Sequence, residues 1–248
     1  MSGRERTGGR AADELRPTTI EAGFVRTATG SALISAGETR VICTASVQES
    51  VPRWMMGKGR GWLTSEYGML PASTGERKQR DVSKGRPDGR TVEIQRLIGR
   101  SLRGVVDFES LGERSVYVDC DVLEADGGTR CAAITGGYVA LQLALGRLVE
   151  QGLLERVPLT QSIAAISCGM VDGEPLLDLD YSEDSRAEVD MNVVMTGDGG
   201  LVEVQATAER TPLSRASLDE LLALAAAGIG RLRDAQEAAA GALPEAAA

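Results

Sequence analysis

The sequence predicts an α+β fold, and three observations carry the prediction. Several stretches alternate apolar with polar residues, which is the period of a β-strand, and others repeat apolar residues at helical spacing. Strands are grouped with helices between them, without the strict alternation of a parallel α/β fold. We therefore expect mixed or antiparallel sheets with helices packed on one face. Because no linker separates two units, we expect a single domain over residues 1–248, with an ordered core at about 10–238 and a disordered tail over 239–248.

The strands are expected to form antiparallel hairpins. Alternation on both sides of Gly37-Glu38 predicts the first hairpin over residues 31–48. Residues 49–90 are rich in Gly, Ser and charge, so we expect mostly loop there, interrupted by the apolar segment 61–70. Residues 115–128 form one strand that ends in a Gly-Gly turn. Two further hairpins are expected, one over 162–180 and one over 187–209.

Three amphipathic helices are expected. The first spans residues 91–106, with its arginines off the apolar stripe. The second has its apolar face over 134–149 and begins with small residues, which allow close packing. The third begins at a capping box formed by Ser217 and Glu220 and continues to Leu232.

The composition excludes several kinds of chemistry. The chain contains no histidine, so Ser-His-Asp and Cys-His catalysis and His-ligated zinc are ruled out, and acid-base work falls to carboxylates. The cysteines are scattered without a CxxC spacing, which is typical of buried free thiols (Cys43, Cys120, Cys131, Cys168). No apolar run approaches the about 18 residues that span a bilayer, and residues 1–10 lack the apolar stretch of a signal peptide. We expect a cytoplasmic protein with no membrane partner.

The charge is uneven along the chain. The net formal charge is −9, from 27 Lys or Arg and 36 Asp or Glu. Residues 53–103 nevertheless hold twelve basic and five acidic residues, a local net of +7, which leaves 15 basic and 31 acidic residues elsewhere. A local field guides an anion whatever the total charge, so this segment favours a phosphate-rich ligand held in one place. A solvated basic loop is the alternative.

Three polar segments carry candidate chemistry. Gly89-Arg90-Thr91 opens a helix, where unpaired N–H groups and a guanidinium suit phosphate. Asp126-Gly127-Gly128-Thr129-Arg130 turns from a strand into a helix and offers backbone N–H groups beside a hydroxyl and a guanidinium. Residues 183–190 hold five charges and place Asp190 on the polar face of a strand, where carboxylates suit Mg²⁺. Each segment also has a plain interpretation: a solvated arginine, an ordinary Gly-Gly turn and a polar strand entry.

The chain resembles the bacterial RNase PH family from about Arg10 to Leu232. The matching segments are GRAADELRP at 9–17, ICTASV at 42–47, GWLTSEYGMLP at 61–71, GRTVEIQRLIGRSLR at 89–103, DCDVLEADGGTRCAAITG at 119–136 and EDSRAEVDMNVV at 183–194. The resemblance implies a ribosomal protein S5 domain 2-like fold and a homohexamer built as a trimer of dimers. It implies a phosphorolytic 3′-to-5′ exoribonuclease that acts on tRNA precursors and other RNAs. Inorganic phosphate would be the co-substrate and nucleoside 5′-diphosphates the products, and the reverse reaction would be that of a tRNA nucleotidyltransferase.

The resemblance also implies roles for individual residues. The phosphate-binding arginine of the family matches Arg90, and its phosphate loop matches Gly128, Thr129 and Arg130. Its catalytic acidic pair matches Asp184 and Asp190, which would also support Mg²⁺. The basic loop would guide the RNA backbone (Arg77, Arg80, Lys84, Arg86).

The chain departs from the family pattern in a few places. Gly8-Gly9-Arg10 stands where Asp-Gly-Arg is common, and Ala206 and Arg210 stand where the family usually has glycine. At a positive φ either replacement would strain the backbone by about 1 kcal/mol. Three alternatives remain: a noncatalytic ring scaffold, an RNA-binding module without chemistry, and polynucleotide phosphorylase. The intact arginines and aspartates argue against the first, and the single core without an internal repeat argues against the last.

Overall fold

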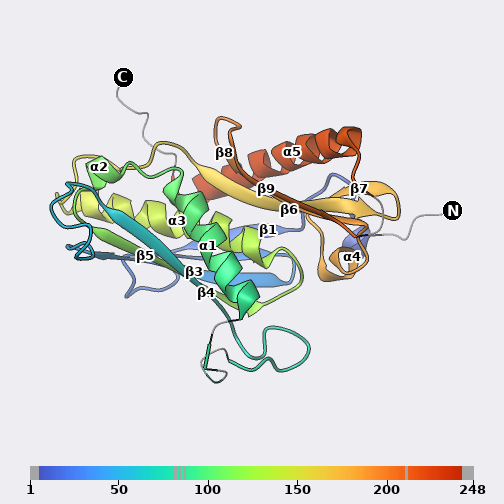
Figure 1. Ribbon diagram of the computed structural model, residues 1–248, viewed down its shortest axis with the longest axis horizontal. Coiled ribbons are helices and arrows are strands. Elements are labelled where there is room, and N and C mark those ends of the chain that lie inside the picture. Colours follow the sequence, from blue (N-terminus) through green and yellow to red (C-terminus); the bar gives the residue numbers. More distant parts are fainter. Residues whose placement is uncertain (1–5, 81–82, 84, 87, 210–211, 242–248) are drawn as a thin grey trace.

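The computed structural model describes residues 6–80, 83, 85–86, 88–209 and 212–241. It has an α+β fold built on two sheets, which confirms the predicted class (Figure 1). The strand orders are β1-β2-β3-β5-β4 and β7-β6-β8-β9. The first sheet contains β1 (Thr18–Ala22), β2 (Gly30–Ala36), β3 (Thr39–Gln48), β4 (Trp62–Met69) and β5 (Ser115–Glu124). The second contains β6 (Ile163–Val171), β7 (Glu174–Leu177), β8 (Val189–Thr196) and β9 (Leu201–Ala208).

The three predicted hairpins are present. β2 pairs with β3, β6 with β7 and β8 with β9, all antiparallel. The first hairpin turns at Gly37, whose φ is 56°. A Cβ on Gly37 would lie 2.9 Å from the Arg16 Cδ atom, so both the backbone and the packing of this turn require glycine.

Two strands were not expected from the sequence. β4 lies in the segment where mostly loop was predicted, and it pairs parallel to β5. Its core-facing side chains are Leu63, Ser65 and Tyr67, so the polar Ser65 interrupts the apolar alternation. Ser65 is satisfied in the core because its hydroxyl donates to the Gln95 carbonyl at 2.8 Å. β1 is a short edge strand of which Ile20 packs against the core.

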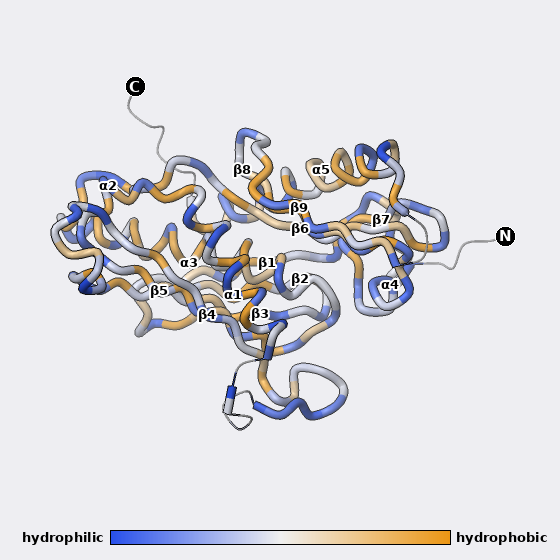
Figure 2. The backbone as a smooth tube through the Cα atoms, in the orientation of Figure 1, coloured by the Kyte–Doolittle hydropathy of each residue, from blue (hydrophilic) through white to orange (hydrophobic). Residues whose placement is uncertain are grey.

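Helix α3 (Thr129–Glu150) lies between the two sheets and forms the centre of the molecule (Figure 1). It packs against β2 and β3 of the first sheet and against β6 of the second. A Cβ on Gly136 would lie 2.8 Å from the Ile34 Cγ2 atom, which confirms that small residues permit close packing here. Figure 2 shows hydrophobic segments along α3, β6 and α5, whereas the connection between β4 and α1 is largely hydrophilic.

One helix bears on the expectation that the chain has no membrane span. Among the residues that the structure describes, α3 is long and apolar enough to cross a membrane by length and composition. The sequence interpretation missed it because polar residues break the apolar run, although the averaged hydropathy is high. Of the apolar window, 78% is buried inside the fold, as in the core helix of a soluble protein.

Of the other long helices, α1 lies on the same face of the first sheet as α3, and α5 lies on the outer face of the second sheet. Helix α1 (Gly89–Arg103) packs on β4 beside α3, so the first sheet carries helices on one face, as predicted. The opposite face of the first sheet presents exposed polar residues such as Glu66 and Asp121. Helix α5 (Arg215–Ala240) covers the second sheet on the side away from α3. The second sheet therefore has helices on both faces.

Several helix boundaries differ from the predicted ones. α1 begins at Gly89 and ends at Arg103 rather than spanning 91–106. The N-cap of α5 is Ser214, whose hydroxyl accepts from the Ser217 amide at 3.0 Å, so the predicted capping box at Ser217 is wrong. α5 continues to Ala240, two residues past the predicted end of the ordered core, and the rest of the predicted tail, 242–248, lies outside the described residues. The short helices α2 (Phe108–Leu111) and α4 (Tyr181–Asp184) and a 3₁₀ turn (Thr7–Gly9) were not predicted.

All four cysteines are buried free thiols, as predicted. Cys43 and Cys120 lie opposite each other on β3 and β5, and both thiols point toward the Ala133 carbonyl.

Candidate active site

The turn after β5 places backbone N–H groups at the start of α3. Gly127 and Gly128 adopt left-handed backbone, with φ of 78° and 65°, and Gly128 is the N-cap of α3. A Cβ on Gly127 would lie 2.6 Å from the Leu179 carbonyl, so the turn packs directly against the segment after β7. Thr129 and Arg130 leave this turn at a helix N-terminus, where unpaired N–H groups and the helix dipole favour an anion.

Thr129 is held by a tyrosine of the first sheet. Thr129 is buried, and its hydroxyl lies 2.9 Å from the hydroxyl of Tyr67 on β4. Burial raises the pKa of Tyr67, while the hydrogen bond to Thr129 and the charges of Arg90 and Arg130 oppose the rise. Tyr67 therefore stays neutral and acts as a hydrogen-bond partner. Because the charges of Arg90 and Arg130 both lower the pKa of the Tyr67 hydroxyl, both arginines lie near it.

Arg90 extends from the N-terminus of α1. It is the second residue of that helix and is exposed, and Asp88 caps the helix by accepting from the Arg90 amide at 3.2 Å. The first turns of α1 and α3 meet, because Glu93 Oε1 lies 3.2 Å from Arg130 Nη1. Two helix N-termini with an arginine each therefore lie side by side. The sequence predicted each of them as a candidate anion site, but not that they adjoin.

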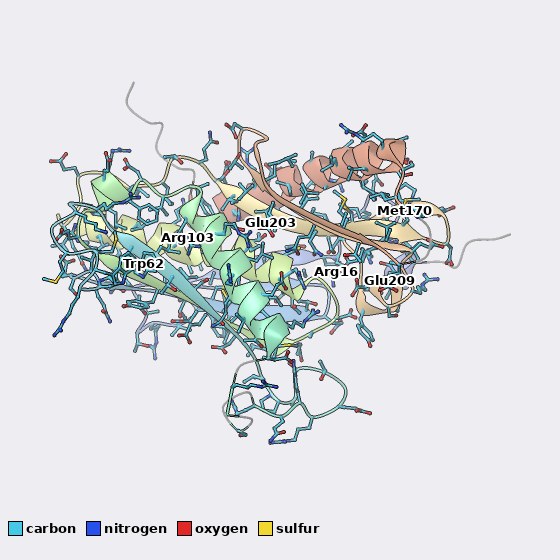
Figure 3. All side chains as sticks on the ribbon, viewed as in Figure 1. Arg16, Trp62, Arg103, Met170, Glu203 and Glu209 are labelled. Atoms are coloured by element: carbon cyan, nitrogen blue, oxygen red, sulfur yellow. The ribbon has the colours of Figure 1, made fainter. Side chains whose placement is uncertain are left out.

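Arg130 also connects these helices to the second sheet. Its Nη1 donates to Gln205 Oε1 on β9 at 2.8 Å, and the Gln205 amide donates to Glu93 at 3.2 Å and to Glu203 at 2.9 Å. Glu203, labelled in Figure 3, in turn pairs with Arg100 of α1 at 3.1 Å. The network fixes β9 against α1 and holds the guanidinium of Arg130 by one nitrogen, Nη1.

The two predicted aspartates lie on the second-sheet side of the site. Asp184 ends α4, and Asp190 is the second residue of β8, on the polar face with Asn192 as predicted. Burial is the main cause that raises the pKa of each carboxyl, and the charge of Asp184 raises the pKa of Asp190 further. Arg90 and Arg130 oppose both rises. The structure thus brings together the two arginines, the Gly-Thr-Arg turn and both aspartates.

These two carboxylates suit a magnesium ion. A divalent cation between them would offset the negative charge of Asp184, which raises the pKa of Asp190. Mg²⁺ typically binds through one or two carboxylates, several waters and substrate phosphates. Within the described ranges, no group of three or more His, Cys, Asp or Glu side chains could hold a metal, so an ion here would depend on Asp184, Asp190, water and phosphate.

The basic loop lies between β4 and α1. Arg80 lines a cavity of about 260 Å³ together with Lys78, Tyr67 and Thr91, so it adjoins the phosphate side of the site. Arg77 and Arg86 are exposed in the same loop, but neither lines this cavity. Lys84 lies outside the described residues.

Several residues of this neighbourhood escaped the sequence interpretation. Tyr67 was present in the quoted segment GWLTSEYGMLP but received no role. Glu93 and Gln205 gave no signal, because their partner Arg130 is 37 and 75 residues away. Ala206 lies inside β9 opposite Met191 without a positive φ, so the suspected strain is absent there, and Arg210 lies outside the described residues.

Comparison with known proteins identifies the class of this site. A family model described as "3' exoribonuclease family, domain 1" matches residues 14–145, and "3' exoribonuclease family, domain 2" matches residues 161–228. The chain belongs to this 3′ exoribonuclease family. Most of α3 falls within the first match, yet the helix packs on β6 of the second.

A curated relative narrows the class. The chain is 57% identical over 228 residues to a protein called ribonuclease PH from Syntrophomonas wolfei, covering 92% of this chain and 95% of the relative. Together with the family, this identity makes the chain a phosphorolytic 3′-to-5′ exoribonuclease.

Solved structures share the fold. A chain of the Archaeoglobus fulgidus exosome with RNA bound to the active site aligns with a TM-score of 0.78 at 24% identity, covering 93% of this chain and 92% of that one. Rice Rrp46 aligns with a TM-score of 0.76 at 19% identity, covering 94% and 98%.

Proposed function

We propose that this protein trims the 3′ ends of tRNA precursors and other RNAs in the cytoplasm, with inorganic phosphate as the attacking group. One observation carries the assignment: two arginines at adjoining helix N-termini face two aspartates whose pKa values burial raises, all around the Gly-Thr-Arg turn. Cations and donors on one side and carboxylates on the other are what phosphoryl transfer between two anions needs.

Arg90, Arg130, Thr129 and the backbone N–H groups after Gly128 would bind the phosphate. Inorganic phosphate is already ionised near neutral pH, so it needs positioning rather than a strong base, which agrees with a chain that lacks histidine. A phosphate oxygen bonds to the phosphorus of the last phosphodiester, and the bond from that phosphorus to the 3′ oxygen of the preceding nucleotide breaks. The terminal nucleotide leaves as a nucleoside 5′-diphosphate, and the RNA keeps a free 3′ hydroxyl.

Asp184 and Asp190 would hold Mg²⁺ and serve the departing oxygen. When bound, Mg²⁺ supplies positive charge against the phosphoryl oxygens. One of the two carboxyls would also deliver a proton to the departing 3′ oxygen, and the pKa of each is raised in the absence of a cation. Arg80 and Lys78, in the cavity beside Tyr67, would guide the RNA backbone toward this point, with Arg77, Lys84 and Arg86 of the same loop.

The deciding experiment incubates the purified protein with a 3′-extended tRNA and Mg²⁺, with and without phosphate, and identifies the released nucleotides. We expect nucleoside diphosphates that appear only with phosphate. Monophosphates released without phosphate would mean hydrolysis and overturn the proposal, and tight RNA binding without release would favour a binding module or a scaffold. The reverse reaction, addition of nucleotides to RNA from nucleoside diphosphates, should release phosphate.

We further propose a homohexamer arranged as a trimer of dimers, which rests on the resemblance to the family. Sedimentation equilibrium should give six times the 26.1 kDa chain mass. A smaller assembly that retains full turnover would overturn this part alone.

A further inference from the structure

An N-terminal strap, residues 6–17, contacts the segment 177–183, which leads directly to Asp184. The strap precedes β1, and its three arginines are directed inward toward residues 177–183. Arg6 Nε pairs with Glu183 at 2.7 Å, and Arg10 Nη2 pairs with the same carboxylate at 3.2 Å. Arg6 and Arg16 are only 8% and 5% exposed. The proposed chemistry assigns no role to any of these arginines.

Arg16 differs from the other two because it also contacts the phosphate turn. Its Nε and Nη2 bind the two oxygens of Asp178 at 3.0 and 2.6 Å, and its backbone amide donates to the same carboxylate at 2.8 Å. The remaining nitrogen, Nη1, donates to the Asp126 carbonyl, where the Gly-Gly turn begins. All three guanidinium nitrogens are therefore used by protein acceptors.

The contacts of Arg16 lie on the two segments that lead to the proposed site residues. On one side, Arg16 Nη2 lies 3.0 Å from the position of a Cβ on Gly128, so the guanidinium packs against the residue before Thr129. On the other side, Asp178 has a φ of 53°, an uncommon backbone for a residue other than glycine, and its carboxylate is held there by Arg16. The chain then reaches Asp180, which caps α4, the helix that ends at Asp184.

We propose that Arg16 is a positioning residue that sets the phosphate donors of the turn against the acidic pair. It joins the first-sheet turn that presents Thr129 and Arg130 to the second-sheet segment that presents Asp184. A planar guanidinium with three engaged nitrogens fixes both partners in one geometry, which a lysine cannot do. The proposal rests on the proposed phosphate site. It predicts that loss of Arg16 separates phosphate binding from RNA binding.

The test uses two variants of this contact in the full-length protein. Arg16→Lys keeps the charge but loses the bridge, and Arg16→Met with Asp178→Asn removes both charges so that no buried carboxylate is left unpaired. Asparagine tolerates the left-handed backbone of position 178. We expect the KM for phosphate to rise about 10- to 100-fold, because a displacement near 1 Å of binding groups has effects of that size. The KM for RNA should stay within about twofold of the wild type.

Arg114→Met is the matched control. Arg114 also joins a carboxylate to two carbonyls, binding Glu49 at 3.0 Å and donating to Leu111 and Leu153 at 2.9 and 3.2 Å. It lies beside Trp62, on the side of Figure 3 opposite to Arg16. This variant should lower the melting temperature while the KM for phosphate is unchanged. If Arg16 were only structural, its variants would likewise lower the melting temperature and leave the KM for phosphate unchanged.

The outcomes are distinguishable. If the Arg16 variants fold and keep the wild-type KM for phosphate, the inference is wrong. If the double variant does not fold, Arg16→Lys decides by the same measurement. If wild-type turnover itself does not depend on phosphate, the proposed function fails first.

Discussion

Replacing Glu93 by glutamine should strengthen the binding of phosphate. Glu93 Oε1 lies 3.2 Å from Arg130 Nη1, and the Glu93 side chain is 42% exposed. A partly exposed pair of this kind contributes about 0.2–1 kcal/mol. Phosphate must share Arg130 with this carboxylate, and the two negative groups repel each other. Removing the charge should therefore lower the KM for phosphate by about 1.4- to 5-fold, which is that free energy expressed as a ratio.

The assay is a phosphate titration of the initial rate at saturating RNA. Asp219→Asn is the matched control, because it removes one negative charge from an ion pair of the same 3.2 Å length on α5. The control should leave the KM for phosphate unchanged. A higher KM for phosphate in Glu93→Gln would refute the reasoning, since it would mean that Glu93 holds Arg130 in place for phosphate rather than competing with it.

Three further substitutions test the site. Arg90→Ala should raise the KM for phosphate about 10- to 150-fold, the equivalent of a charge-assisted hydrogen bond of about 1.5–3 kcal/mol, while sedimentation shows unchanged assembly; an unaltered phosphate dependence would remove Arg90 from the site. Asp190→Asn should abolish turnover without loss of RNA binding. Burial, together with the charge of Asp184, raises the pKa of Asp190, so the folded state holds this proton more tightly than the unfolded state, where the pKa is about 3.9. The stability of the wild type therefore falls as the pH rises from the unfolded-state pKa through the higher folded-state pKa. Metal-free melts should show Asp190→Asn gaining stability over the wild type from about pH 4 upward, and an equal melting temperature at neutral pH would contradict this. Tyr67→Phe should lower stability by about 0.5–1.5 kcal/mol in urea unfolding, because the buried Thr129 hydroxyl loses its partner, and no loss would mean that water replaces it.

Local patterns predicted the parts of this protein that depend on neighbours in the chain. The hairpins follow from alternation around Gly37 and around the later turns, and the candidate anion-binding segments follow from residues placed where helices begin. β4 was missed because the polar Ser65 faces the core. Ser65 can be buried there because its hydroxyl donates to the Gln95 carbonyl, 30 residues away. The role of Arg16 was invisible for the same reason, since its carboxylate partner is 162 residues away. Sequence motifs pointed to the proposed reacting groups, whereas the contacts that orient these groups arise only on folding.

The charges of the proposed site would couple the binding of phosphate to the binding of a cation. Arg90 and Arg130 lower the pKa values of Asp184 and Asp190, against the rise that burial causes. Phosphate bound to the arginines would cancel that opposition, so the aspartates would then bind a proton or a cation more tightly. Binding free energies are reciprocal, so a cation at the aspartates must strengthen phosphate binding by the same factor. Arg16 connects the segments that carry the two groups, and the strength of this coupling therefore depends on how rigidly it holds them together.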